Sequence, residues 1–256
     1  MGNIASALSN LGVPLIAAQI IVLIAIVIVV LGLLTLSKGF FQSVMNKKNN
    51  EPMLLKGSKN AKNSLVISQD PKEEGAITLY RSHEEDKGIE FSYSMWLLID
   101  NFTYKTGEWK HILHKGNDTG YPNRAPGLYL HPDKNSIRFY MNTYENILEY
   151  VDIDNIPMRK WLHVVVSLNQ KNLDIYFNGY LRKRHELSSL PRQNFGDVWM
   201  NLFGGFEGYM SNVQYFRYAL SHQQVENIVR SGPSKDACGD SGEMPPYLDD
   251  SWWYDF

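Results

Sequence analysis

The sequence predicts a mainly β protein, an antiparallel β-sandwich that follows one transmembrane α-helix. Three observations lead to this fold class. Residues 14–36 form an uncharged apolar run, β-rich runs separated by turn residues follow from about residue 76, and these runs do not alternate with long helices. We therefore expect an anchor and one separate β domain.

The segment from Pro14 to Leu36 is the predicted transmembrane helix. As a helix it is about 34 Å long, which is enough to cross a hydrocarbon core of about 30 Å. A cleavable signal peptide is the alternative, and it would need basic residues ahead of a shorter apolar region. Residues 1–13, the short N-terminal segment, contain no Lys or Arg, so we favour a permanent single-pass anchor.

Two signals bear on the orientation of this anchor. Lysines follow the span within residues 37–75, which we interpret as a basic juxtamembrane linker, and the positive-inside rule then places the C-terminal domain on the cytosolic side. The first residues match the N-myristoylation pattern with Gly2 as the acceptor, and this lipidation requires a cytosolic N-terminus. The two signals conflict unless acylation precedes insertion.

The composition indicates the redox environment of the protein and the kind of partner that it lacks. Cys238 is the only cysteine, so no intramolecular disulfide can form and nothing indicates an oxidising environment. The net charge is −2, and no basic stripe with interleaved aromatic residues is present, so we expect no nucleic-acid partner.

The β domain is predicted over residues 76–233, with residues 64–68 as a preceding first strand. The Asn178-Gly179 pair indicates a type I′ hairpin within a three-stranded meander, and Ser221 is positioned to cap a short helix over 222–230. The predicted strands are 76–81, 89–99, 110–115, 126–131, 136–141, 146–153, 161–169, 172–178, 180–185, 197–203 and 207–218.

The order of several motifs carries a family resemblance. These are FSYSMW at 91–96, WLHVVV at 161–166, DIYFNG at 174–179 and GGFEGYMSNV at 204–213. Together they resemble a concanavalin A-like, laminin-G-like jelly roll. In sequence, these motifs are most similar to those of membrane-anchored versions encoded by large DNA viruses. Proteins with this fold have diverse functions.

The resemblance implies that loops at one rim of the sandwich hold calcium and a glycan or a protein. No motif gathers the candidate oxygen ligands, so we assign no cofactor and no metal site. The histidines have no zinc-type spacing either. The acidic candidates are Asp118, Asp133, Asp152 and Asp154, and the histidines are His111, His114, His131 and His163.

We expect no enzymatic activity. Some members of this fold class hydrolyse polysaccharides with carboxylates on one strand face, but in the nearest segment Asp152 and Asp154 share a face while Glu149 lies on the other. Trp96 and Trp161 are flanked by apolar residues and are expected in the sandwich core rather than exposed for sugar stacking. Gly204, Gly205 and Gly208 are interpreted as backbone-shaping residues.

Residues 234–256 form an acidic aromatic C-terminal tail. Its large aromatic side chains are unfavourable in water, so we expect them to dock on the sandwich or on a partner. These partner-binding candidates are Tyr247, Trp252, Trp253, Tyr254 and Phe256.

The preferred function is a membrane-anchored interaction module, resembling a viral minor capsid protein that links an internal virion membrane to capsid proteins. The alternative is a membrane-anchored carbohydrate-binding receptor or adhesin. A linker requires the domain on the cytosolic side, whereas a glycan receptor requires it outside the cell.

Overall fold

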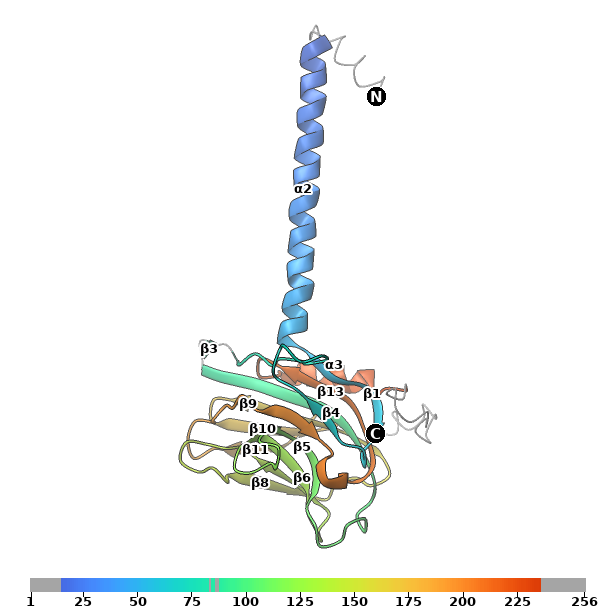
Figure 1. Ribbon diagram of the computed structural model, residues 1–256, viewed down its shortest axis with the longest axis vertical. Coiled ribbons are helices and arrows are strands. Elements are labelled where there is room, and N and C mark those ends of the chain that lie inside the picture. The colour runs from blue at the N-terminus through green and yellow to red at the C-terminus, as the bar shows by residue number, and fades with distance from the viewer. Residues whose placement is uncertain (1–14, 83, 86–87, 236–256) are drawn as a thin grey trace. The chain divides into compact units, whose positions relative to one another are not determined.

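The computed structural model describes residues 15–82, 84–85 and 88–235 in two compact units that meet between Lys48 and Asn49. The first unit consists of the helix α2 (Leu15–Asn50) up to that boundary, and the second is an antiparallel β-sandwich with one covering helix (Figure 1). Gly2 and the tail candidates Tyr247, Trp252, Trp253, Tyr254 and Phe256 lie outside the described residues.

The helix α2 contains the predicted apolar segment and continues well beyond it. Within it, the stretch Val22–Lys47 is long and apolar enough to cross a membrane, and by length and composition it fits a membrane span or a signal sequence. Residues 37–50 belong to the helix rather than to a flexible linker. The physical reason is that no proline interrupts the helix before Pro52.

The sandwich consists of a seven-stranded and a six-stranded sheet. The larger sheet has the order β1-β13-β4-β9-β10-β11, with β3 paired to β4, and the smaller has the order β2-β12-β5-β6-β7-β8. The larger sheet is built from β1 (Met53–Asn60), β3 (Glu84–Glu85), β4 (Gly88–Asn101), β9 (Trp161–Asn169), β10 (Asn172–Phe177), β11 (Tyr180–Glu186) and β13 (Glu207–Phe216). The smaller is built from β2 (Leu65–Ile67), β5 (Lys110–Gly116), β6 (Arg124–Leu130), β7 (Ser136–Tyr140), β8 (Tyr150–Asp154) and β12 (Asp197–Met200).

The predicted linker over residues 37–75 is therefore wrong in its C-terminal part as well. β1 pairs with β13, and β2, which confirms the first strand expected at 64–68, pairs with β12. Leu54, Leu55 and Ile67 from these strands are buried in the core between the sheets. The sandwich thus begins near residue 50, because two strands ahead of residue 76 complete the edges of its sheets.

The strand predicted at 76–81 does not form. The side chain of Gln69 takes the place of a neighbouring strand: its Nε2 donates to the Ile77 carbonyl oxygen at 2.9 Å, and its Oε1 accepts from the Leu79 amide at 2.9 Å. Since these backbone groups are satisfied by a side chain, the segment needs no sheet partner.

The remaining predicted strands are found with shifted ends. The meander β9-β10-β11 is confirmed, and Asn178 and Gly179 turn between β10 and β11 with φ values of 49° and 87°. β8 begins only at Tyr150, and β12 ends at Met200. There the left-handed Asn201, with φ of 54°, leads into the 3₁₀ helix η1 (Leu202–Gly204).

The helix α3 (His222–Ser231) confirms the predicted cap. The Ser221 hydroxyl accepts from the Gln224 amide, and the Gln224 side chain accepts from the Ser221 amide, which makes a capping box. Val225 and Val229 of this helix pack on the outer face of the seven-stranded sheet.

Trp96 and Trp161 are buried, but on that outer face rather than between the sheets. Met95 and Leu97 of β4 point into the inter-sheet core, so Trp96, which lies between them, points the opposite way and packs with Leu98 and Trp161 beside Val229. One face of the seven-stranded sheet is therefore covered by the other sheet, and its opposite face is partly covered by α3.

Two glycines confirm the backbone-shaping interpretation. A Cβ at Gly208, where φ is 142°, would lie 1.8 Å from the Leu98 carbonyl oxygen, and one at Gly205, where φ is 44°, would lie 2.0 Å from the Ala61 carbonyl oxygen. Only a residue without a side chain allows these close approaches.

Candidate functional site

The outer face of the six-stranded sheet carries a cluster of arginines and aromatic residues, which we call the arginine–tyrosine face. Ala125 and Leu128 of β6, Phe139 of β7 and Val151 of β8 point into the core, so the residues next to them point outward. A register shift in β6 between Arg124 and Gly127 places Arg124 on the outer side. No helix of the described part of the chain packs on these residues. The face consists of Trp109, Arg124, Arg138, Tyr140 and Tyr150.

Two guanidinium groups lie over tyrosine rings on this face. Arg124 lies 3.6 Å from the ring centroid of Tyr140, and Arg138 lies 3.7 Å from that of Tyr150 and 4.7 Å from that of Trp109. Such cation–π contacts hold planar, charged donors in a fixed orientation. Tyr150 and Trp109 remain 48% and 40% exposed, so the cluster is open to a ligand.

The two arginines differ in their ion pairing. Arg138 is bound by Asp152, its cross-strand neighbour, through Nε–Oδ1 and Nη2–Oδ2 contacts of 2.7 Å each. The hydrogen bonds that Arg138 donates to Asp152 raise the pKa of Arg138. Arg124 has no carboxylate partner among the described residues, and its buried Nε has no hydrogen-bond partner there. Of the two arginines in this cluster, Arg124 is therefore the one whose charge no described carboxylate neutralises.

The predicted acidic candidates do not form a metal site. Asp152 is occupied by Arg138, and the Oδ1 of Asp118 accepts from the Thr119 amide at 2.8 Å. Asp133 acts electrostatically on Lys110, on the other side of a turn. Within the described ranges no group of three or more His, Cys, Asp or Glu side chains could hold a metal ion.

His111 and His114 form a closed chain of hydrogen bonds. His111 Nδ1 accepts from the Leu202 amide at 2.9 Å, which leaves its Nε2 to donate to His114 Nδ1 at 2.6 Å, and His114 Nε2 then donates to the Asn117 carbonyl oxygen at 2.6 Å. Burial lowers the pKa of both imidazoles. Every ring nitrogen is used, so this pair stabilises the loop after β5 rather than binding a metal.

His163 contacts the Ser94 hydroxyl at 2.8 Å, but this pair is not a catalytic arrangement. Both residues are at most 1% exposed beneath α3, and burial lowers the pKa of His163 to about 3. No substrate can reach the hydroxyl group in this position. His131 serves locally, since its Nδ1 accepts from the Asp133 and Lys134 amides.

Glu149 is enclosed rather than available as an acid or nucleophile. Its carboxylate accepts from the Ser188 amide at 2.8 Å, the Ser188 hydroxyl at 2.7 Å and the Thr143 hydroxyl at 3.0 Å. Burial raises its pKa, but these hydrogen bonds outweigh that effect and the net pKa is lowered. The carboxylate stabilises the turn that precedes β8.

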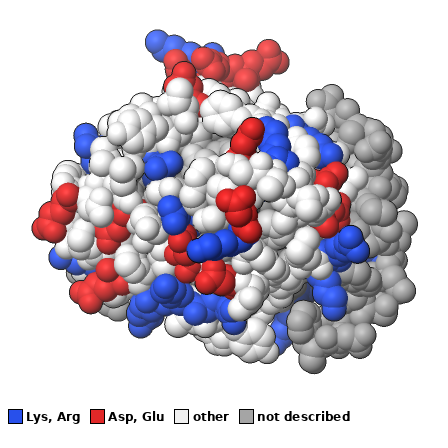
Figure 2. All heavy atoms as spheres, turned by 90° about the horizontal axis from the view of Figure 1, so that it is seen from below, with Lys and Arg blue, Asp and Glu red and all other residues white. Residues whose placement is uncertain are grey.

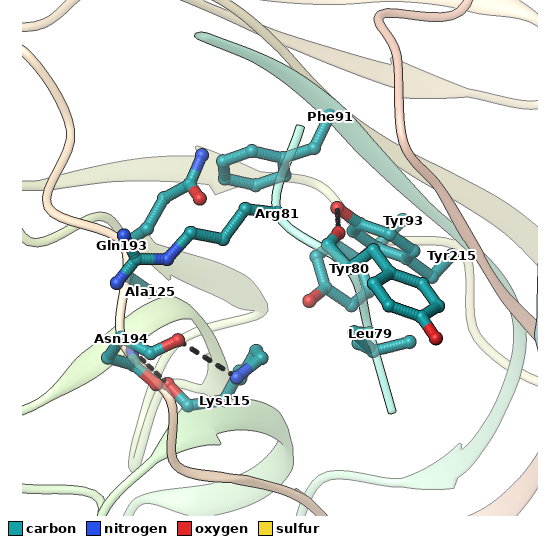
Figure 3. Close-up of a pocket in the computed structure, with 10 residues that line it drawn as sticks. All are labelled: Leu79, Tyr80, Arg81, Phe91, Tyr93, Lys115, Ala125, Gln193, Asn194 and Tyr215. Carbon is teal, nitrogen blue, oxygen red and sulfur yellow. Dashed lines mark hydrogen bonds between the residues drawn. The ribbon is translucent and has the colours of Figure 1, made fainter. Parts of the chain in front are cut away.

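A second candidate site is a hollow between the segment before β3 and the loop before β12. It comprises two adjoining cavities of about 30 Å³ and 520 Å³, which share Leu79, Tyr80, Arg81, Lys115 and Asn194 in their lining. Figure 3 shows Arg81 and Gln193 on one side of it and Tyr80 and Tyr215 on the other. Arg81 stacks on Phe195, with its guanidinium carbon 3.9 Å from the ring centroid.

Lys115 lies at the bottom of this hollow, but its ammonium group is already bound. It donates to the carbonyl oxygens of Asn194 and Gly196 at 3.1 and 2.7 Å, and burial lowers its pKa to about 8. We interpret Lys115 as a structural support for this loop.

Charge is mixed over the side of the molecule drawn in Figure 2. Acidic and basic side chains are interspersed with uncharged surface, without a large region of one sign. This view agrees with the absence of a basic stripe in the sequence. The arginine–tyrosine face itself was missed by sequence reasoning, although the alternation in SIRFY and YVDID predicts which side chains point outward.

Comparisons with known proteins agree with the sandwich. Residues 71–226, more than half of the chain, match the concanavalin A-like lectin/glucanases superfamily, and no curated protein sequence gives a significant match. The ligand-binding domain of botulinum neurotoxin serotype D in complex with N-acetylneuraminic acid aligns at 13% identity and a TM-score of 0.52, over 72% of this chain and 52% of that chain. The receptor-binding domain of botulinum neurotoxin D aligns at 14% identity and a TM-score of 0.50, over 72% and 53%.

This chain spans about half the length of those solved domains, and at these identities the likeness is one of fold. The family match covers the strands β3 to β13 and the first turn of α3, and it begins after β1 and β2. The chain belongs to the concanavalin A-like lectin/glucanases superfamily.

Proposed function

We propose that this chain is a non-enzymatic interaction module, held at a membrane by α2, whose sandwich binds another protein through the arginine–tyrosine face. The observation that carries the proposal is the pair of guanidinium groups stacked on the partly exposed Tyr140 and the exposed Tyr150, where no described helix covers the sheet. Arg, Tyr and Trp are the residues most enriched at the energetic centres of protein interfaces. The receptor-binding role of structural neighbours supports a binding module of this fold.

We further propose that the module is a viral structural protein, which links an internal virion membrane to capsid proteins. Support comes from the motifs that resemble membrane-anchored proteins of large DNA viruses, and from the lysines that follow the apolar segment. Those lysines favour a cytosolic domain. A protein between an internal membrane and its shell needs this orientation.

A glycan-binding receptor or adhesin is the alternative, and the N-acetylneuraminic acid bound to one structural neighbour favours it. Sugar recognition commonly uses a free aromatic face. On this sheet one face of Tyr140 and one face of Tyr150 are already covered by guanidinium groups. This occupancy favours a protein ligand, for which arginine and tyrosine act together.

Site-specific photo-cross-linking in the native membrane or particle tests the proposed face. We would place p-benzoylphenylalanine at Tyr150, and at Tyr180 as a matched control, because Tyr180 is 70% exposed on the edge strand β11. We expect a defined protein adduct from position 150 and a much weaker one from position 180. Equal labelling from both positions, or none, would contradict the proposed face.

Protease protection on intact membranes tests the proposed orientation. We expect the sandwich to be cleaved when protease is added to the cytosolic side. A sandwich that is protected there, together with binding of sialylated glycans by the purified protein, would replace the linker with the receptor alternative.

A further inference from the structure

We propose that the C-terminal segment of this chain, residues 236–256, docks on the arginine–tyrosine face of its own sandwich and competes there with the partner. The inference rests on the function proposed for that face, because it describes how access to the face is regulated. Four features support it: charge, aromatic content, reach and the lack of an equivalent surface on the basic edge strand β11.

Charge complementarity is the first feature. The segment contains six carboxylate side chains and no Lys, Arg or His. Arg124 has no carboxylate partner in the described part of the chain, and Arg138 has one. A carboxylate beside Arg124 would make a charge-assisted hydrogen bond at a partly buried position, where it is stronger than on open surface.

Aromatic content is the second feature. The segment ends in Trp252, Trp253, Tyr254 and Phe256, with Asp250 before them and Asp255 between Tyr254 and Phe256. Burying a large aromatic side chain is favourable, because it removes apolar surface from water. The exposed rings of Tyr150 and Trp109 provide an apolar surface next to the cations, so one short stretch can satisfy both requirements.

Reach is the third feature. Ser234 is held beside β1 and β13, where its amide donates to the Ser211 hydroxyl and its carbonyl oxygen accepts from Ser58. β7 is four strand spacings, about 20 Å, from the edge strand β2 of the six-stranded sheet, and the two sheets lie about 10 Å apart, so a path around that edge to the outer face is about 40 Å. The 21 residues from 236 to 256 span at most about 70 Å. The aromatic end can therefore reach the face, whereas the residues near 240 cannot.

The edge strand β11 is one competitor for the acidic segment. It carries the exposed cations Arg182 and Lys183, but its exposed side chains include only one aromatic ring, Tyr180. A charge-only interaction there would be weak and strongly screened by salt. The combination of rings and guanidinium groups favours the arginine–tyrosine face.

Cross-linking within the full-length protein in lipid nanodiscs tests the inference without any partner. With p-benzoylphenylalanine at Trp253, we expect irradiation to give adducts on peptides that contain residues 138–150. Mixing ¹⁵N-labelled and unlabelled copies would show that each adduct joins two parts of one chain. Arg124→Gln should lower the adduct yield at least fivefold, and Arg182→Gln on β11 should leave it unchanged.

The outcomes separate this inference from the proposed function. Adducts on β11, on lipid, on another copy, or on no site would overturn docking of the segment. Partner capture from position 150 would then still stand. Conversely, loss of partner capture with intact adducts from position 253 would overturn the partner proposal alone. Near-ultraviolet circular dichroism of the Arg124→Gln variant checks that its sandwich is folded.

Discussion

Buried imidazoles are a recurring feature at the scale of single residues. His111, His114 and His163 are each at most 1% exposed, and burial lowers the pKa of each. These three side chains pack in the interior and form hydrogen bonds there. These imidazoles resist protonation in the folded state, so the stability of the fold depends on pH.

The first prediction concerns His163, whose pKa falls from an ordinary 6.5 to about 3. Above pH 6.5 the imidazole is neutral in the folded and in the unfolded chain, so it does not change the unfolding free energy. Below pH 6.5 the unfolded chain binds a proton that the folded chain does not, so stability falls by about 1.4 kcal/mol per pH unit for this group. In His163→Gln, the slope of unfolding free energy between pH 6 and 5 should be smaller by that amount.

Denaturant titrations followed by tryptophan fluorescence measure this slope. His222→Gln controls for the loss of a histidine as such, because His222 is exposed on α3. An unchanged slope in His163→Gln would contradict the assignment of this residue as a buried neutral imidazole.

The second prediction concerns Gly208. In Gly208→Ala the new methyl group would lie 1.8 Å from the Leu98 carbonyl oxygen, so β13 or β4 must shift. We expect a loss of about 3 kcal/mol or more, measured as a lowered midpoint of thermal unfolding. The matched control is Gly107→Ala, which also has a positive φ, of 84°, but meets no atom within 4 Å and should lose about 1 kcal/mol. Equal losses in the two variants would show that the close approach is absent.

At the scale of elements, local signals and tertiary contacts decided different features. The Asn178-Gly179 turn and the capping box of α3 are local, and both were predicted correctly. The absence of a strand at 76–81 was not predicted, because it depends on the Gln69 side chain reaching across from another segment. A side chain that replaces a strand leaves no periodic signal in the sequence.

The third prediction concerns the cap of α3. Ser221→Ala removes the hydroxyl that accepts from the Gln224 amide, and we expect a loss of about 1 kcal/mol in unfolding free energy. Because Val229 of α3 packs beside Trp96 and Trp161, a loosened helix should also shift tryptophan emission to longer wavelength. Ser231→Ala, which removes an exposed hydroxyl at the other end of α3, should change neither quantity. An unaltered emission and stability in Ser221→Ala would contradict a covering role that depends on this cap.

At the scale of the whole molecule, the sandwich is larger than its turn pattern indicates. β1 and β2 precede residue 76, yet β1 completes one edge of the seven-stranded sheet and β2 one edge of the six-stranded sheet. Each covers a neighbouring strand that would otherwise present unpaired backbone groups. The folding unit therefore begins near Asn49.

The fourth prediction follows from this boundary. A fragment of residues 49–235 should be soluble and unfold cooperatively, whereas a fragment of residues 76–235 should aggregate. The shorter fragment lacks Leu54, Leu55 and Ile67 from the core and exposes β13 and β12 as new edges. Size-exclusion chromatography and thermal denaturation compare the two. A shorter fragment that is monomeric and cooperative would contradict the role of β1 and β2.

The sequence by itself determined the features that depend on neighbours along the chain: the apolar helix, the outward and inward alternation of the strands, the hairpin turn and the helix cap. It also carried the motifs that revealed the family. The tertiary structure alone decided where the sandwich begins and which outward side chains meet. Arg124, Arg138, Tyr140 and Tyr150 come from three strands, and only their pairing places guanidinium groups over rings. The physical reason is that such contacts depend on the register between strands, and residues far apart in sequence set that register only when both sheets have formed.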